Sequence, residues 1–287
     1  MQHHVDGDLH DGATVSVTDR GFRYGDGAVE TMRLYGGTVF NWDAHASRLA
    51  TTCEQLGIDH GLDRAELHER VIETVTANDL TEAVVTLAIT RGDHPTDVAP
   101  APPEDPTVVI GADPAPPGGR DGARPRMPPA TLQTVRTRRV PPAWGPGDDR
   151  TLSRLTAVRA HQELRAMTRD DPADEALLRD SDDAIAGGAT STVFFVTDAG
   201  LHTPATPAAP ETVLRETVLD LARAEAIPVH EGAFDREALY TAAEAFLART
   251  RWGLRPIGSV DGIDIGDGPV TALLRSRYDG VVESACY

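Results

Sequence analysis

The pattern of hydrophobic and polar positions predicts a chain in which strands and helices are mixed. Residues 32–35 alternate between apolar and polar, and residues 38–40 form a second short apolar run after Gly36-Gly37. This composition is typical of a β-hairpin with a two-residue turn. A helix is expected next, with Asn41 or Asp43 as its N-cap, and it should end near Gly57.

The same pattern continues to the end of the 287-residue chain. It predicts helices over 63–75, 151–168, 211–226 and 271–278, strands over 83–90, 107–110, 130–140, 175–179 and 193–196, a further apolar segment over 240–247, and a loop over 249–256. Residues 113–129 are so rich in proline and glycine that they predict a linker. The expected organisation is therefore an N-terminal α/β domain (1–112), a linker (113–129) and a larger C-terminal domain (130–287).

One stretch, residues 19–49, is too particular for generic packing. It contains D-R-G-x-x-Y-G-D-G-x-x-E-T from Asp19 to Thr31, followed by H-x-x-R-L from His45 to Leu49. By itself, Arg48 near a helix N-terminus and a glycine-rich turn could hold an anion. The alternative for a single residue is a solvated surface arginine. The whole stretch, however, resembles the signature of the fold-type IV pyridoxal-phosphate enzymes, which include class IV aminotransferases and 4-amino-4-deoxychorismate lyases.

The resemblance implies a fold, a cofactor and an assembly. The fold class would be α+β, with two α/β domains and a cleft between them, as in D-amino-acid aminotransferase. The cofactor would be pyridoxal 5'-phosphate, and the assembly a homodimer. The resemblance places Arg48, Thr250 and the segment Thr212–Val213 at the cofactor phosphate, with Thr212 in place of a glycine.

The chain departs from the family at two positions that carry the chemistry. The run Arg150-Thr151-Leu152-Ser153-Arg154-Leu155 matches the family's lysine motif, but Arg150 stands where the Schiff-base lysine is expected. A guanidinium stays protonated and is a poor nucleophile. In residues 185–196, Gly187 replaces the glutamate that partners the pyridine nitrogen, so no group remains there to keep the ring protonated.

Composition changes this picture in one respect above all, because all 27 basic side chains are arginine and the chain contains no lysine. No neighbouring lysine can therefore replace the missing one. The formal net charge of −18 argues against nucleic acid or an anionic membrane surface as partner. An excess of acidic residues of this size is typical of proteins from organisms that live at high salt. No apolar run is long enough for a membrane span, so a cytoplasmic protein is expected. Neither cysteine lies in a ligand-spaced cluster, and no metal site is predicted.

These observations leave three hypotheses. The first is an anion-binding homologue without Schiff-base catalysis, in effect a pseudoenzyme that binds a small anionic molecule. The second is an active aminotransferase or aminodeoxychorismate-type lyase that acts on an amino acid or a chorismate-derived substrate with pyridoxal phosphate held non-covalently. The third is an enzyme that works without the cofactor, with Tyr24, His45, Asp148 or Asp149 as candidate bases and Arg150 as a substrate-orienting residue. Each of these candidates can equally be a structural or solvated side chain.

Overall fold

The structure is a computed structural model that describes residues 1–93, 97–100, 105–119, 127–141, 143, 145–147, 150–167 and 173–287. The chain divides into two compact units. Unit 1 comprises Met1–Arg124, Asp148–Arg154 and Val282–Tyr287, and unit 2 comprises Pro125–Gly147 and Leu155–Val281. The segment around Arg150 therefore belongs to unit 1, although it lies in sequence between two parts of unit 2.

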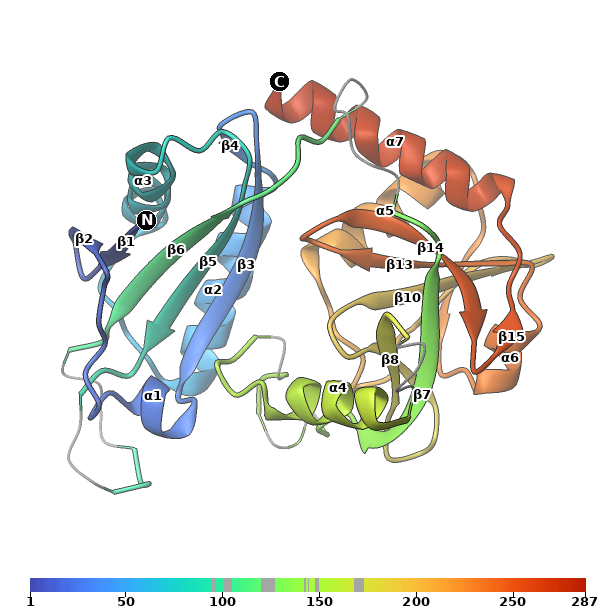
Figure 1. The fold of residues 1–287 in the computed structure, drawn as a ribbon, viewed down its shortest axis with the longest axis horizontal. Coiled ribbons are helices and arrows are strands. Elements are labelled where there is room, and N and C mark those ends of the chain that lie inside the picture. The colour runs from blue at the N-terminus through green and yellow to red at the C-terminus, as the bar shows by residue number, and fades with distance from the viewer. Residues whose placement is uncertain are drawn as a thin grey trace. The chain divides into compact units, whose positions relative to one another are not determined.

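Unit 1 is built on a six-stranded sheet with the order β2-β1-β6-β5-β3-β4, in which every neighbouring pair is antiparallel (Figure 1). The strands are β1 (Gln2–Val5), β2 (Asp8–Asp11), β3 (Gly27–Tyr35), β4 (Thr38–Val39), β5 (Ala83–Thr90) and β6 (Val108–Pro114). The predicted hairpin is present between β3 and β4, and its turn residues Gly36 and Gly37 both have positive φ values, 53° and 85°. A two-residue hairpin turn of this kind favours glycine because side chains are strained at positive φ.

Two helices of unit 1, α2 (Trp42–Leu56) and α3 (Arg64–Ala77), cover one face of this sheet. The short helix α1 (Arg20–Tyr24) precedes β3 and contacts β5. Leu49 of α2 and Val71 of α3 belong to one apolar cluster with alternate residues of β3 and β5, such as Met32 and Leu87. Since alternate side chains of a strand point to the same face, α2 and α3 both lie against that face.

Unit 2 contains a nine-stranded mixed sheet with the order β12-β11-β10-β13-β14-β7-β8-β9, and β15 pairs with β14 off this path (Figure 1). The strands are β7 (Ala130–Arg138), β8 (Glu175–Arg179), β9 (Ile185–Gly188), β10 (Thr192–Thr197), β11 (Gly200–Pro204), β12 (Val229–Gly232), β13 (Glu244–Arg249), β14 (Gly253–Val260) and β15 (Ile263–Asp264). The pairs β11/β12, β14/β7 and β7/β8 are parallel and the others antiparallel.

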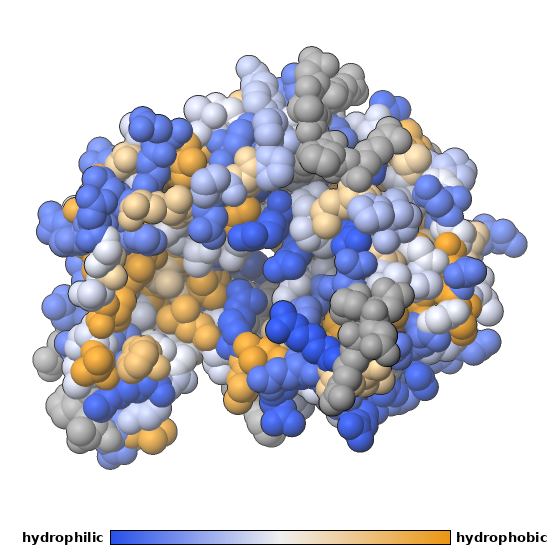
Figure 2. All heavy atoms as spheres, in the orientation of Figure 1, coloured by the Kyte–Doolittle hydropathy of each residue, from blue (hydrophilic) through white to orange (hydrophobic). Residues whose placement is uncertain are grey.

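The other helices in the described part of the chain are α4 (Leu155–Met167), α5 (Val213–Ala224), α6 (Arg236–Tyr240), for which no helix was predicted, and α7 (Pro269–Cys286). Ala160 and Leu164 of α4 pack with Val135 of β7 and Leu178 of β8 in one apolar cluster. A second cluster joins β10, β13 and β14 through Phe195, Leu247 and Ile257. On the face seen in Figure 2, hydrophilic side chains predominate, as the acidic composition leads one to expect.

Four predicted elements need correction. Residues 253–256 belong to β14, not to a loop, and pairing with β7 begins at Ile257, immediately after the proline that suggested a loop. The helix expected from Thr151 begins at Leu155, because residues 150–152 hydrogen-bond to β3. The strand β6 runs two residues into the predicted linker, of which residues 120–126 lie outside the described residues. The last helix is much longer than the eight residues expected, since α7 runs from Pro269 to Cys286.

Candidate functional site

Arg48 lies in the second turn of α2 and points to a buried carboxylate of the sheet. Its Nε donates a 2.6 Å hydrogen bond to Oε1 of Glu30, and Nη2 donates a 3.2 Å bond to Oε2. His45, one turn earlier, contributes a 2.8 Å hydrogen bond between its Nδ1 and Oε2 of Glu30. Glu30 is on β3, in phase with Ala28 and Met32, so its side chain enters the face that α2 covers. Three residues of the signature thus form one charged cluster.

The electrostatic balance of this cluster favours the ionised form of Glu30. The carboxylate is only 1% exposed, and burial alone would raise its pKa. The hydrogen bond with His45 and the charge and hydrogen bonds of Arg48 outweigh burial and hold the pKa of Glu30 below its ordinary value. Arg48 therefore carries out a structural task in this fold, besides any contact with a ligand.

Arg150 is held at the edge of β3 through its backbone. The amide of Val29 donates a 2.9 Å hydrogen bond to the carbonyl of Arg150, and the amide of Leu152 donates a 3.0 Å bond to the carbonyl of Gly27. Thr151 forms an isolated antiparallel bridge with Ala28. Arg150, the residue predicted at the family's lysine position, is thus adjacent to Val29, the neighbour of Glu30 in the same strand.

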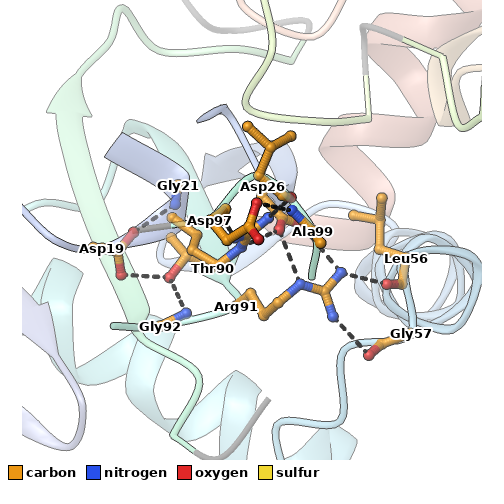
Figure 3. A network of polar contacts seen from close by, with 12 residues as sticks. Asp19, Gly21, Asp26, Leu56, Gly57, Thr90, Arg91, Gly92, Asp97 and Ala99 are labelled. Carbon is orange, nitrogen blue, oxygen red and sulfur yellow. Dashed lines mark hydrogen bonds and ion pairs between the residues drawn. The ribbon is translucent and has the colours of Figure 1, made fainter. Parts of the chain in front are cut away.

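The glycine-rich turn ahead of β3 is held by acidic residues of the signature (Figure 3). Oδ1 of Asp19 caps α1 by accepting hydrogen bonds from the amides of Gly21 and Phe22, at 2.7 and 3.3 Å. Its other oxygen accepts a 2.6 Å hydrogen bond from the hydroxyl of Thr90. Asp19 therefore joins α1 to the end of β5.

A second carboxylate, Asp26, binds two arginines in the same region (Figure 3). It accepts hydrogen bonds from Nε of Arg20 at 2.7 Å and from Nε and Nη2 of Arg91 at 2.9 and 3.1 Å. Arg91 also donates to the carbonyls of Leu56 and Gly57, the end of α2, where a cation is favoured by the helix dipole. The aspartates and arginines of the signature are thus largely scaffold.

Tyr24, the candidate base, lies at the end of α1 and is 40% exposed. The guanidinium carbon of Arg20 is 4.9 Å from the centroid of its ring, which is cation–π geometry. Its role as a catalytic residue stays a prediction. The other candidate bases, Asp148 and Asp149, lie outside the described residues.

In unit 2, Thr212 is the N-cap of α5. Its hydroxyl oxygen accepts a 3.0 Å hydrogen bond from the amide of Arg215. Val213 is the first residue of the twelve-residue helix, so its amide is one of those left without an intrahelical partner at a helix N-terminus. Backbone amides and the positive end of the helix dipole together favour an anion at such a position.

Two further residues, Thr192 and Gly187, lie near Thr212 in unit 2. The hydroxyls of Thr192 and Thr212 are 3.4 Å apart. Thr192 pairs with Ala248 in the β10/β13 ladder, and Thr250 follows two residues later in the turn after β13. An ideal Cβ on Gly187 would lie 3.7 Å from Cδ of Pro210, two residues before Thr212. Thr192 and Gly187 thus lie close to the N-terminus of α5, and Thr250 follows β13, the strand that pairs with β10.

Two residues of these clusters were not assigned a role by sequence reasoning. Glu30 belongs to the signature, but the sequence motif gives no indication that its carboxylate binds Arg48. Arg139 has no local signal, because it lies in a run of several arginines before a proline-rich turn. The structure places its buried guanidinium against β9, where Nη2 donates a 2.6 Å hydrogen bond to the carbonyl of Gly188.

Known protein families and proteins resemble this chain over most of its length. Residues 27–260 match the family model of amino-transferase class IV. A protein of Methanocaldococcus jannaschii, named provisionally as a branched-chain-amino-acid aminotransferase, is 32% identical over 274 residues, covering 94% of this chain and 91% of that protein. The chain therefore belongs to the class IV aminotransferase family, as its signature predicted.

Solved structures show the same fold. The branched-chain aminotransferase of Thermoproteus uzoniensis with norvaline has a TM-score of 0.88 and 28% identity, covering 99% of this chain and 95% of its own. The 4-amino-4-deoxychorismate lyase of Pseudomonas aeruginosa has a TM-score of 0.81 and 27% identity, covering 99% and 100%. A branched-chain aminotransferase from Escherichia coli has a TM-score of 0.88 and 26% identity, covering 98% and 94%. The predicted fold-type IV architecture, with mixed helices and sheets, is confirmed.

The residues present fit only part of the cofactor that this family implies. The N-terminus of α5 suits a phosphate, since it offers backbone amides and a hydroxyl-bearing cap. Covalent attachment through a lysine does not fit, because the sequence contains no lysine. At Gly187 there is no side chain to bind a ring nitrogen.

None of the helices in the described part of the chain is long and apolar enough to cross a membrane.

Proposed function

We propose that this protein is an anion-binding member of the class IV aminotransferase family that does not carry out Schiff-base catalysis. The observation that carries the proposal is the absence of lysine from the whole sequence, together with Arg150 at the family's lysine position. An amine that can lose its proton is needed to attack an aldehyde and to shuttle a proton at the substrate carbon. A guanidinium performs neither step at any working pH.

Two features support anion binding. In unit 2, the N-terminus of α5 combines uncapped amides with the hydroxyl of Thr212, and Thr250 and Thr192 lie at the same end of the sheet. In unit 1, Arg48 retains its position on α2, and Glu30 and His45 hold it in place. The ligand expected at the N-terminus of α5 is a small phosphate-bearing or carboxylate-bearing molecule.

The first experiment titrates the purified protein with pyridoxal phosphate and follows the visible absorbance spectrum, then applies borohydride and measures the intact mass. We expect saturable binding without a borohydride-stable mass increase. A stable adduct would overturn the proposal and would identify an unexpected amine, beginning with the α-amino group of Met1.

The anion position is tested with two nearly isosteric variants of the α5 cap. Asn and Asp are both strong N-caps, so Thr212→Asn and Thr212→Asp should leave the helix equally intact. Only Asp adds a negative charge, which repels a bound phosphate. We expect T212D to weaken binding of pyridoxal phosphate by about tenfold relative to T212N, a difference of about 1.4 kcal/mol. Equal affinities of the two variants for pyridoxal phosphate would show that its phosphate does not bind at this position.

An active aminotransferase or lyase is the alternative function, and similarity to M. jannaschii and P. aeruginosa proteins over nearly the whole chain favours it. Turnover of D-alanine, a branched-chain amino acid or 4-amino-4-deoxychorismate with added pyridoxal phosphate would establish it. We expect no turnover above that of a Thr212→Asp control.

We also propose a homodimer, by family resemblance. Light scattering after size exclusion should give twice the chain mass of 30.7 kDa. A mass of one chain at micromolar concentration would contradict this assembly.

A further inference from the structure

Gly187 lies next to the buried guanidinium of Arg139, in the direction in which any other residue would carry its Cβ. An ideal Cβ on this glycine would lie 3.2 Å from the carbonyl oxygen of Ser191, 3.7 Å from Cδ of Pro210 and 4.0 Å from Nη2 of Arg139. Arg139 is 4% exposed, and the same Nη2 donates a 2.6 Å hydrogen bond to the carbonyl of Gly188. The guanidinium is therefore fixed across β9 next to Gly187.

The position is also fixed on the strand side. Gly187 has a φ of 102°, and it pairs with Leu178 of β8. The amide of Arg139 donates a 2.9 Å hydrogen bond to the carbonyl of Arg179, the next residue of the same strand. Arg139 directly follows β7 and Gly187 lies on β9, and β8 pairs with both of these strands. Because Gly187 has no Cβ, no side chain stands between the backbone of β9 and the guanidinium.

The charge of Arg139 determines what kind of group suits this place. A guanidinium offers only hydrogen-bond donors and keeps its positive charge, so it pairs best with a carboxylate or another oxyanion. A protonated ring nitrogen, which is also a cation and a donor, is repelled there. The family's arrangement, in which a carboxylate of the protein meets a cationic ring, has the opposite sign.

Pro210 links this place to helix α5. It faces Gly187 and stands two residues before the N-cap Thr212. The Gly187 position and the N-terminus of α5 are therefore neighbours within unit 2, and both favour anions for independent reasons.

We propose that Arg139 and Gly187 form a carboxylate subsite beside the oxyanion position at α5. The ligand would be a small molecule that carries a carboxylate and, on the other side of a ring or short chain, a phosphate or second carboxylate. This inference rests on the proposed anion-binding function and names the class of ligand for it.

The test compares two probes by isothermal titration calorimetry with the full-length protein. Benzyl phosphate carries the phosphate alone, and 3-carboxybenzyl phosphate adds the carboxylate. We expect the carboxylate to improve the affinity of the wild-type protein by about tenfold or more, because a charge-assisted hydrogen bond is gained. Arg139→Gln should lose this improvement and keep the affinity for benzyl phosphate. Arg138→Gln is the matched control, since Arg138 is 40% exposed and bonds to Asp183.

Arg139 is buried, so a second pair of variants tests the subsite without removing it. Asn and Asp tolerate positive φ better than other non-glycine residues, and they differ by one charge. In Gly187→Asp the new carboxylate should compete with the ligand's carboxylate for the guanidinium of Arg139 and abolish the preference for 3-carboxybenzyl phosphate, whereas Gly187→Asn should retain it. Backbone strain is common to both variants and cancels in the comparison.

The outcomes separate this inference from the proposed function. If benzyl phosphate binds and the carboxylate adds no affinity, the subsite is wrong and the phosphate position stands. If Gly187→Asp keeps the preference as fully as Gly187→Asn does, the carboxylate binds elsewhere and the subsite is again wrong. If neither probe binds the wild-type protein, the proposed anion-binding function itself fails, and this inference fails with it.

Discussion

Arg48 has a structural role that its motif does not suggest, because its side chain binds the buried carboxylate of Glu30. The guanidinium makes two hydrogen bonds to the buried carboxylate, and His45 makes a third. Removing Arg48 leaves the charge of Glu30 in an apolar face between β3 and α2, so its loss affects folding before it affects any ligand. Loss of binding in an Arg48 variant is therefore meaningful only beside a stability measurement.

The corresponding prediction is for Arg48→Ala in urea denaturation at pH 7. We expect the free energy of unfolding to fall by about 3 kcal/mol, the usual cost of breaking one side of a buried ion pair. Arg64→Ala is the control, because Arg64 and its partner Asp43 are both exposed, and it should cost about 0.5 kcal/mol or less. Equal losses in the two variants would show that Glu30 does not need Arg48.

At the scale of elements, helix α5 depends on its cap. The hydroxyl of Thr212 accepts a hydrogen bond from the amide of Arg215. The family resemblance implies a glycine at this position in related proteins. Threonine thus adds a capping bond that glycine cannot make, at the same helix end to which the anion is assigned.

A series at Thr212 measures this bond. Thr212→Ala should lower the free energy of unfolding by about 1 kcal/mol, Thr212→Gly by only a few tenths, and Thr212→Ser should be near wild type. Urea denaturation with circular dichroism gives the order. If alanine is as stable as serine, the hydroxyl does not cap α5.

A second element, the edge formed by β11 and β12, contains two stacked histidines. The ring of His202 lies 4.8 Å from His230 and 5.0 Å from Phe195, with its Nε2 2.9 Å from the hydroxyl of Thr197. Burial and the neighbouring charge of His230 hold the pKa of His202 below its ordinary value. The folded state therefore favours the neutral ring.

The sign of the pH dependence follows from that direction. Above about pH 6.5, the ordinary pKa of histidine, both folded and unfolded states are neutral at this residue and stability is complete. As the pH falls below that value, the unfolded state binds the proton more readily and stability is lost. His202→Phe should therefore lose less stability between pH 7.5 and pH 5.5 than the wild type, measured by urea denaturation at each pH. His10→Phe, a change at an exposed histidine, should behave as wild type, and a His202 variant that does the same would contradict the assignment.

At the scale of the whole molecule, the net charge of −18 is the dominant property. Repulsion among excess carboxylates opposes the folded state, and salt screens it, with a screening length that falls from about 10 Å at 0.1 M to about 3 Å at 1 M. This is the physical basis for proposing that the protein works at high salt.

We therefore expect the melting temperature at pH 7 to rise by about 3 °C or more between 0.1 M and 2 M KCl. The gain should shrink near pH 4.8, the isoelectric point of the sequence, where the excess charge is neutralised. Differential scanning fluorimetry can record both series. A melting temperature that falls with salt at pH 7 would show that local ion pairs, such as Asp26 with Arg91, outweigh the net repulsion.

The sequence alone determined the family, the hairpin and the absence of lysine. A motif spread over residues 19–49 is recognisable without a fold, and two glycines between alternating runs specify a turn because of their own backbone freedom. The absence of lysine is a property of composition, so no tertiary structure can restore the amine.

Only the tertiary structure decided which side chains meet. Glu30 and Arg48 are 18 residues apart, and periodicity predicts the face of each element but not its partner across the core. Arg139 and Gly188 are 49 residues apart and meet because β7, β8 and β9 pair side by side. The start of α4 was misjudged for the same reason, since Leu152 fits the apolar spacing of the helix but residues 150–152 hydrogen-bond to β3. Local sequence sets propensity, and long-range packing selects among the contacts that propensity allows.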